Sequence, residues 1–184
     1  MIICGIDEAG RGPLAGPVTA AAVVLPPGFP LELLDDSKKL SEAQRERALR
    51  VILQEALAYS VGWAWPEEID AINILQASLL AMKRAYELLP LRPDRVFVDG
   101  PFCPEIDARV EAIVHGDSLI KEIEAASILA KTARDRWMVR YSWIDDRFGF
   151  ERHKGYPTAE HRRLCGVHGL SEIHRRSFRI FPSA

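Results

Sequence analysis

The stretch "GIDEAGRGPLAGP", residues 5–17, contains the strongest structural signal in the chain. The apolar run at residues 2–6 is typical of a buried strand, and it leads directly into two adjacent acids, Asp7 and Glu8. Three glycines and two prolines occupy residues 9–17, which favours an irregular loop after the strand. Two negative charges beside such a loop predict either an acidic turn in water or half of a metal site, with glycines that let a substrate approach the main chain.

The rest of the chain alternates between strand and helix patterns. Strands are predicted at residues 17–25, 58–65 and 95–99 and within 108–117. Helices are predicted after Ser41, with Gln44 completing a capping box, over residues 66–89 and 120–143, and in a short segment after Thr158. Short connections between the first strands favour antiparallel pairing, and helical crossovers between the later ones favour parallel pairing. We therefore expect an α/β fold with a mixed five-stranded sheet flanked by helices and a helical C-terminal part.

Composition limits the class of protein. The 184 residues, 48% hydrophobic and 27% charged, suffice for one globular domain with a buried core. The longest uncharged apolar stretch, residues 17–27, is too short to span a bilayer. No basic region precedes the apolar N-terminal residues, so we expect neither a membrane span nor a signal peptide. The three cysteines have no CxxC spacing, which fits a reducing cytoplasm.

Charge is distributed unevenly along the chain. Residues 131–184 carry 12 Lys and Arg against 6 Asp and Glu, together with four of the five histidines. Residues 1–130 carry 12 basic and 20 acidic residues. The basic C-terminal third predicts either a solvated helical face or a surface that holds a polyanion beside an acidic centre.

Three separate apolar runs end in an aspartate: "IICGID" in Asp7, "RVFVD" in Asp99 and "VEAIVHGD" in Asp117. Groups at the carboxyl ends of neighbouring strands converge on one crevice, so we expect these carboxylates to meet, with Glu8 beside them. Four carboxylates at close range repel one another, and divalent cations relieve that repulsion. Oxygen ligands without Cys or His favour Mg²⁺ or Mn²⁺, and two such ions can stabilise an in-line phosphoryl displacement.

Other patterns are less specific. The glycines at 10, 12 and 16 miss the spacing of a dinucleotide-binding loop and no helix follows them, so we reject that function. Asp135 follows Lys131 at helical spacing, which predicts an ion pair. Lys38 and Lys39 fit phosphate contacts and a solvated loop equally well. We expect the histidines at 153, 161, 168 and 174 to cap, pack or approach phosphates, and Cys165 has no evident base partner.

A set of motifs, in this order, resembles the bacterial ribonuclease HII family, the type 2 ribonucleases H. The similarity runs from Gly5 to about Phe178, and it is specific as a set although each motif alone is weak. The motifs are "GIDEAGRGPLAGPV", "DSKKLSE", "NILQASLLAM", "VDG", "HGDS", "AASILAKTARDR" and "HKGYPT".

The resemblance implies a ribonuclease H-like fold and a metal-dependent endoribonuclease that uses two Mg²⁺ or Mn²⁺ ions. Members of the family hydrolyse RNA in RNA–DNA hybrids and cut on the 5′ side of single ribonucleotides in duplex DNA, leaving a 3′-hydroxyl and a 5′-phosphate. The expected partners are therefore hybrids and ribonucleotide-containing duplexes, in DNA repair and replication. We expect a cytoplasmic monomer with no membrane association.

The resemblance also implies roles for individual residues. The family's acidic ligands correspond to the four carboxylates that the strand-end pattern selects, namely Asp7, Glu8, Asp99 and Asp117. Its substrate-binding residues correspond to the loop whose backbone surrounds the substrate 2′-hydroxyl and to a tyrosine, namely Gly10, Arg11, Gly12 and Tyr156. On this basis residues 1–145 are expected to form the catalytic core, and residues 146–184 a helical, basic substrate-binding part of the same domain.

Two departures and two alternatives stay open. His115 stands where the family usually has a lysine, and Glu124 where it has a small residue, so Glu124 could add negative charge near the site. One alternative is a junction-resolving deoxyribonuclease on the same fold, which would need no 2′-hydroxyl. The other is a non-catalytic hybrid-binding module, whose expected mark is loss of a metal carboxylate.

Overall fold

The computed structural model describes residues 1–34 and 40–181, and its centre is a mixed five-stranded sheet in the order β3-β2-β1-β4-β5. The strands are β1 (Ile3–Ala9), β2 (Val18–Val24), β3 (Ala58–Ala64), β4 (Arg95–Asp99) and β5 (Val110–Ile113). β2 pairs antiparallel with both β1 and β3, whereas β1 with β4 and β4 with β5 pair parallel. The predicted mixed sheet and both pairing directions are therefore confirmed.

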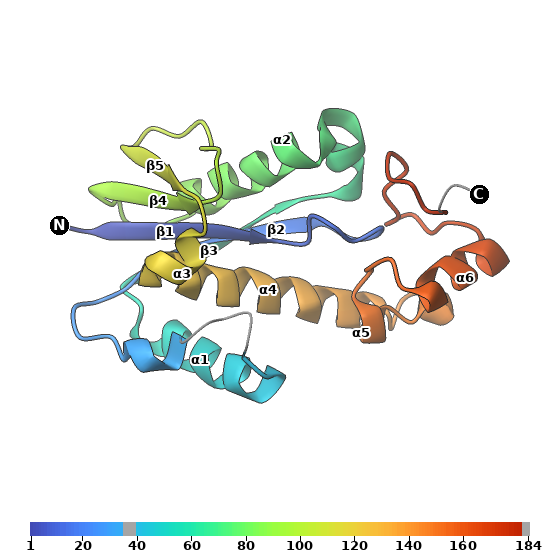
Figure 1. The fold of residues 1–184 in the computed structure, drawn as a ribbon, viewed down its shortest axis with the longest axis horizontal. Helices are drawn as coiled ribbons and strands as arrows, with labels where there is room; N and C mark the ends of the chain where they lie inside the picture. The colour runs from blue at the N-terminus through green and yellow to red at the C-terminus, as the bar shows by residue number, and fades with distance from the viewer. Residues whose placement is uncertain (35–39, 182–184) are drawn as a thin grey trace.

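Helices cover both faces of this sheet (Figure 1). Helix α2 (Pro66–Glu87) packs on β2 and β3, and α4 (Lys121–Tyr141) packs on the opposite face against β1 and β2 with α1 (Glu42–Glu55) outside it. The short α5 (Phe150–His153) and α6 (Ala159–His168) lie beyond one end of the sheet. The remaining helical turns are η1 (Leu31–Leu34), α3 (Gly116–Leu119) and η2 (Asp146–Phe148).

Local sequence explains where most helices begin. The hydroxyl of Ser41 accepts from the Gln44 amide and the Gln44 side chain accepts from the Ser41 amide, so the predicted capping box is present. The predicted helix over residues 66–89 is interrupted, because Asn73 has a φ of 69° and a ψ of 166°. The Asn73 side chain accepts from the Gln76 amide, which starts the second helical segment.

Close packing of α4 against β1 brings this helix next to the end of the strand. A Cβ at Gly5 would overlap the main chain of Glu122 and Ile123, so only a glycine permits this approach. Strand β2 is buried along its whole length, as its alanines and valines predict for a strand between two helical layers. The consequence is that α4 residues one turn further along, such as Ser127, lie beside Asp7.

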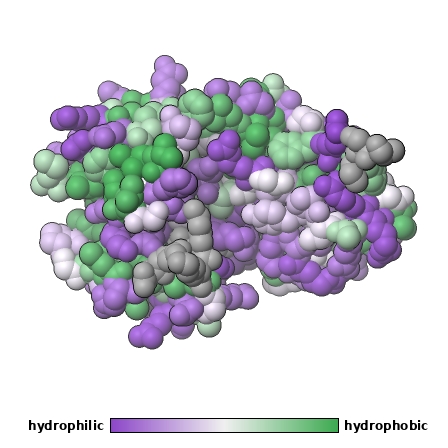
Figure 2. Space-filling model, in the orientation of Figure 1, coloured by the Kyte–Doolittle hydropathy of each residue, from purple (hydrophilic) through white to green (hydrophobic). Residues whose placement is uncertain are grey.

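The C-terminal part has a core of its own that includes the loop after β1. Leu14 and Ala15 pack with Phe148, Phe150 and the residues around them in one buried cluster. Hydrophilic residues cover much of the outer surface at this end of the molecule (Figure 2). Lys38 and Lys39 lie outside the described residues. Within residues 1–34 and 40–181, every helix is too short or too polar to cross a membrane.

Candidate metal centre and adjoining groove

Three aspartates from separate segments converge at one end of the sheet. Asp7 belongs to β1, Asp99 ends β4, and Asp117 lies on α3, the turn that follows β5. One carboxylate oxygen from each lies within 4.8 Å of the others. The expected convergence is therefore observed, because β1, β4 and β5 are parallel neighbours. Asp117 is not at a strand end as its sequence context predicts, but in the first turn of a helix.

Asp99 also positions the segment that carries Asp117. Its Oδ1 accepts from the Gly116 amide at 2.7 Å and from the Asp117 amide at 3.4 Å, which places a carboxylate at the start of α3. His115, which precedes this turn, is exposed and has a left-handed φ of 58°. Its position shows that the departure from lysine concerns an exposed residue and no ligand of the cluster.

The aspartate cluster is electrostatically unfavourable without a cation. Asp7 is 5% exposed, and burial raises its pKa well above the usual value. The negative charges of Glu8 and Asp99 raise this pKa further, whereas the Ser127 hydroxyl opposes the rise. A set of converging oxygen ligands with one carboxyl forced towards its protonated form suits a hard divalent cation, which neutralises the charges and displaces the proton.

Glu8 lies beside the three aspartates and faces the neighbouring pocket. Glu8 follows Asp7 in β1, and successive side chains of a strand point to opposite faces of the sheet. The Glu8 carboxylate forms an ion pair with Arg11 at 3.4 Å. Burial raises the pKa of Glu8, the Arg11 charge lowers it, and the Asp99 charge raises it. The structure thus groups Asp7, Asp99 and Asp117 directly and holds Glu8 next to them with a cationic partner.

A pocket of about 440 Å³ adjoins the acidic cluster. The loop at residues 10–12 forms one side and Tyr156, 37% exposed, forms the other. A Cβ at Gly12 would lie 4.0 Å from the Tyr156 ring, and the Lys131 ammonium lies 5.3 Å from the ring centroid. The four predicted substrate-binding residues therefore line one pocket next to the predicted metal ligands.

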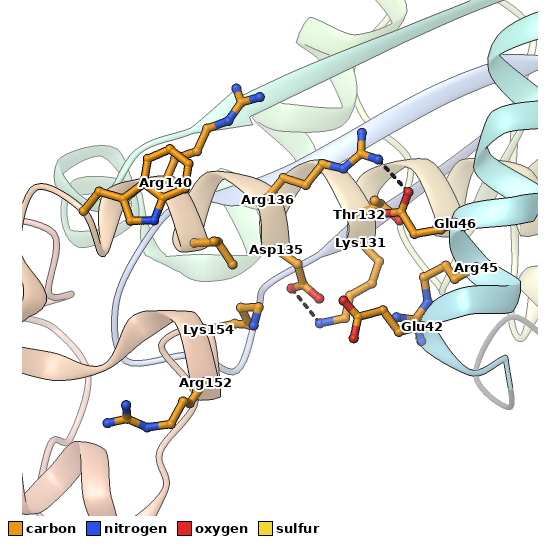
Figure 3. Close-up of a pocket in the computed structure, with 12 residues that line it drawn as sticks. Glu42, Arg45, Glu46, Lys131, Thr132, Asp135, Arg136, Arg140, Arg152 and Lys154 are labelled. Carbon is orange, nitrogen blue, oxygen red and sulfur yellow. Dashed lines mark hydrogen bonds and ion pairs between the residues drawn. The ribbon is translucent and has the colours of Figure 1, made fainter.

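A second hollow of about 600 Å³ continues from this pocket between α1 and α4, and the two share Arg45 and Lys131 (Figure 3). Lys131 forms the predicted ion pair with Asp135 at 2.8 Å, and Arg136 pairs with Glu46 at 2.6 Å. The basic residues that line this hollow are Arg45, Lys131, Arg136, Arg140, Arg152 and Lys154, against the acids Glu42, Glu46 and Asp135. We call the two hollows together the α4 groove; basic residues predominate along it.

Two arginines have positions that the sequence pattern did not predict. Arg134 and Arg175 are fully buried, and their guanidinium groups donate to carbonyls of the loop at 10–17. The sequence predicts either a solvated face or a polyanion-binding surface for residues 131–184, and neither prediction fits Arg134 or Arg175, because both are buried. Arg162 also turns inward and donates to the Ile180 carbonyl. Charge counts could not separate these arginines from the exposed ones, because burial depends on tertiary packing.

Three histidines form a buried chain rather than a phosphate-contacting surface. His161 donates from Nδ1 to the Tyr156 carbonyl at 2.9 Å, and His174 accepts at Nδ1 from the Ser171 amide at 2.9 Å. The two Nε2 atoms are 3.0 Å apart, so neutral His174 donates to neutral His161. His153 accepts from the Gly155 amide at Nδ1 and donates from Nε2 to the Phe148 carbonyl. His168 is exposed.

The hydrogen bonds of His161 and His174 argue against a metal site at His161, Cys165 and His174, although the ligand atoms of these three residues lie within 4.8 Å of one another. A metal at His174 Nε2 would move the proton of the neutral ring to Nδ1, which faces the Ser171 N–H. Two donors would then oppose each other. Cys165 Sγ lies 3.2 Å from His174 Nε2, a neighbour that the sequence did not reveal. This nitrogen carries the ring proton and therefore cannot act as a base, and burial raises the pKa of the thiol.

The histidine chain leads to a prediction about stability and pH. Burial lowers the pKa of His161 and of His174 from 6.5 to about 4, so the unfolded chain binds more protons than the folded protein. The free energy of unfolding should fall as pH decreases from about 6.5 to about 4. Urea unfolding at several pH values measures this change in the free energy of unfolding. The variant Asp7→Asn/Glu8→Gln is used as the background, because the raised pKa values of these two acids make stability increase as pH decreases. An unfolding free energy independent of pH in this range would contradict the assignment.

Comparisons with known proteins agree with this geometry. The model of the family described as Ribonuclease HII matches residues 4–180. Ribonuclease HII from Dechloromonas aromatica is 53% identical over 177 residues, which cover 96% of this chain and 90% of the relative. The crystal structure of ribonuclease H2 from Pyrococcus horikoshii has a TM-score of 0.81 at 27% identity and covers 98% and 95% of the two chains. Archaeoglobus fulgidus RNase HII, solved in a complex with PCNA, has a TM-score of 0.82 at 25% identity, covering 100% and 98%.

Proposed function

The chain belongs to the ribonuclease HII family of metal-dependent ribonucleases H, and from this premise we propose that it incises duplex DNA at single embedded ribonucleotides. Activity on RNA–DNA hybrids follows from the family itself. Incision occurs on the 5′ side of the ribonucleotide. Water attacks the phosphorus that links the ribonucleotide to the preceding nucleotide. The bond from this phosphorus to the preceding 3′-oxygen breaks, and the products carry a 3′-hydroxyl and a 5′-phosphate.

We assign metal binding to Asp7, Glu8, Asp99 and Asp117. The convergence of three carboxylates and the raised pKa of Asp7 support this assignment. Divalent ions held by these residues, Mg²⁺ or Mn²⁺, would supply activation of water and stabilisation of charge on the phosphate, and a pair of them would suit an in-line displacement. The residues' own task is to release the proton that the raised pKa of Asp7 favours and to hold the ligand oxygens in place, which Asp99 does for Asp117 through the amides of α3.

We assign recognition of the sugar to the pocket at Gly10, Arg11, Gly12 and Tyr156. A 2′-hydroxyl both donates and accepts, and it is the group that distinguishes RNA from DNA at one position. The observation that carries the proposal is that this pocket directly adjoins the acidic cluster. A sugar read in the pocket would place its neighbouring phosphate at the carboxylates.

Digestion of a labelled duplex with one embedded ribonucleotide, with and without Mg²⁺ or Mn²⁺, tests the proposed function. We expect one cut on the 5′ side, only with metal, and no cut in the same duplex without the 2′-hydroxyl. Cleavage of an all-DNA four-way junction would support a junction-resolving nuclease instead. Binding without cleavage under every metal condition would support a non-catalytic module.

We further propose that residues 146–184 and the α4 groove together hold the duplex. Phosphate contacts supply affinity without sequence information, and binding should therefore weaken steeply as salt increases. Arg140→Glu and Arg136→Glu should each reduce the slope of log K against log salt by about one if the residue contacts a phosphate. Arg109→Glu, just before β5 and outside the groove, is the matched control. Unchanged slopes for both groove variants would assign the groove cations to a solvated surface.

A further inference from the structure

Arg175 holds the loop of the proposed sugar pocket from beneath. Its side chain is fully buried, and its Nη2 and Nη1 donate to the carbonyls of Gly10 at 2.6 Å and Arg11 at 2.9 Å. Its Nε donates to the Gly16 carbonyl at 2.9 Å, and its own amide donates to the Leu14 carbonyl at 2.8 Å. One residue therefore fixes four carbonyls of the loop.

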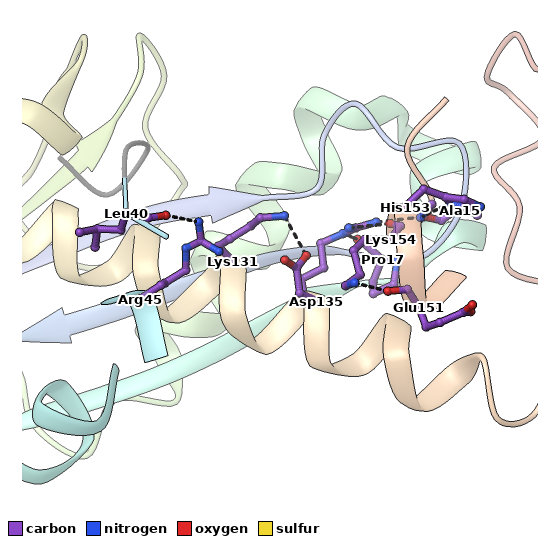
Figure 4. Close-up of polar contacts among 11 residues, drawn as sticks. Ala15, Pro17, Leu40, Arg45, Lys131, Asp135, Glu151, His153 and Lys154 are labelled. Atoms are coloured by element: carbon purple, nitrogen blue, oxygen red, sulfur yellow. Dashed lines mark hydrogen bonds and ion pairs between the residues drawn. The ribbon is translucent and has the colours of Figure 1, made fainter. Parts of the chain in front are cut away.

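Arg134 braces the same loop from helix α4. Its Nε and Nη2 donate to the carbonyls of Pro17 at 2.9 Å and Ala15 at 3.0 Å. Its Nη1 donates to the Lys154 carbonyl at 3.0 Å, in the segment that leads to Tyr156 (Figure 4). A Cβ at Gly10, which has a φ of 93°, would overlap the Arg134 side chain. Arg134 thus joins the two sides of the pocket, whereas among the described residues Arg175 is the one that donates hydrogen bonds to the carbonyls of Gly10 and Arg11.

These contacts determine the direction of two amides. In a trans peptide the carbonyl and the N–H point to opposite sides of the chain. Because the carbonyls of Gly10 and Arg11 face Arg175, the amides of Arg11 and Gly12 point away from it. Neither amide donates to a group in residues 1–34 or 40–181, and both residues line the 440 Å³ pocket. Two adjacent donors are therefore available to a ligand.

The fork of an arginine is needed for this arrangement. Burial lowers the pKa of Arg175 to about 9 and that of Arg134 to about 10, so both remain charged at neutral pH. Their acceptors are carbonyl groups, which a guanidinium can engage in pairs through its planar N–H groups. A lysine ammonium keeps the charge but cannot hold two consecutive peptide planes at fixed angles.

We propose that Arg175 is a positioning residue for recognition of the 2′-hydroxyl: it orients the peptides at residues 10–12 so that the amides of Arg11 and Gly12 face the sugar. This inference rests on the proposed function, because it assumes that the pocket reads a ribose. Arg175 does not touch the substrate, and it acts through the loop backbone that it holds.

Binding to two duplexes in the Asp7→Asn background tests the inference without cleavage. One duplex contains a single ribonucleotide and the other is the same duplex in DNA only. With Arg175 intact we expect the ribonucleotide duplex to bind about tenfold more tightly, as one or two amide hydrogen bonds would give. Adding Arg175→Lys should bring the ratio close to one while the Kd for the DNA duplex stays the same. A merely structural role would weaken binding of both duplexes equally.

A matched variant separates the possible failures. Arg147→Lys, an exposed arginine paired with Asp145, should keep the ratio. A ratio retained in folded Arg175→Lys would overturn the role of Arg175 alone. A ratio of one with Arg175 intact would contradict the proposed reading of the sugar, and this inference with it. If Arg175→Lys does not fold, ¹⁵N-glycine spectra of the Asp7→Asn protein decide: a Gly12 amide signal that shifts equally with both duplexes would overturn the inference.

Discussion

Replacing Asp7 with asparagine is expected to lower the rate of hybrid cleavage by at least about a thousandfold, because several kcal/mol of charge stabilisation at the phosphate would be lost. Asp7 contributes a carboxylate oxygen to the three-aspartate cluster, and burial raises its pKa well above the usual value. Asparagine keeps the shape of the side chain but removes the charge that attracts a cation. The measurement is single-turnover cleavage of an RNA–DNA hybrid in Mg²⁺ and in Mn²⁺.

The same variant should bind the hybrid about as well as the unmodified protein. The substrate pocket is lined by other residues, and removing one charge from a repulsive cluster should not destabilise the fold. Asp146→Asn, an exposed aspartate on η2, is the matched control and should cleave normally. Normal cleavage by both Asp7→Asn and Asp99→Asn, or full activity in excess chelator, would remove these carboxylates from the mechanism.

Local patterns were sufficient to predict the sheet and the main helices. The mixed sheet is predicted by the alternation of strand and helix patterns and by the short connections between the first strands. The capping box at Ser41 predicts where α1 begins. The kink at Asn73 could not be predicted in this way, since a left-handed φ at an asparagine in a helical pattern has no local marker. The turn α3 was missed for a related reason: its four residues form a helix because Asp99, distant in sequence, accepts from its first amides.

The acidic site was predictable because strand order and chain chemistry pointed to the same residues. Aspartates after apolar runs become neighbours once β1, β4 and β5 pair in parallel. The support for the loop was not predictable, because Arg134 and Arg175 look like ordinary members of a basic C-terminal third. Only tertiary packing shows that both are buried beneath the loop at residues 10–17.

Glu124 illustrates a departure whose consequence only the structure shows. The side chain is 2% exposed, which answers the question of which way this helix face points. It forms an ion pair with Lys121 at 2.7 Å, within the first turn of α4. An acid near a helix N-terminus is also favoured by the helix dipole. The extra negative charge is therefore buried together with a cationic partner.

Tyr156 forms the wall of the pocket opposite Gly12, and hydrogen bonds hold both its backbone amide and its backbone carbonyl. Its amide donates to the His153 carbonyl, and its carbonyl accepts from His161 Nδ1. Tyr156 is 37% exposed and lines the pocket, with the Lys131 ammonium 5.3 Å from the ring centroid. A rigid backbone with an accessible ring is what a stacking surface for a nucleotide sugar requires, whereas an aromatic residue that only packs would be buried.

Tyr156→Ala is therefore expected to lower kcat/KM on a duplex with one embedded ribonucleotide. The corresponding loss of transition-state stabilisation should be roughly 1–3 kcal/mol, by analogy with aromatic stacking on bases. Tyr156→Phe separates the ring from the hydroxyl: a damaged alanine variant with an intact phenylalanine variant would assign the effect to the ring. Damage in both would implicate the hydroxyl in the reactive region. Tyr59→Ala, a half-exposed tyrosine on β3 away from the pocket, is the matched control. Near-normal cleavage by Tyr156→Ala would remove the tyrosine from substrate binding and leave the pocket's selectivity to the loop at residues 10–12 alone.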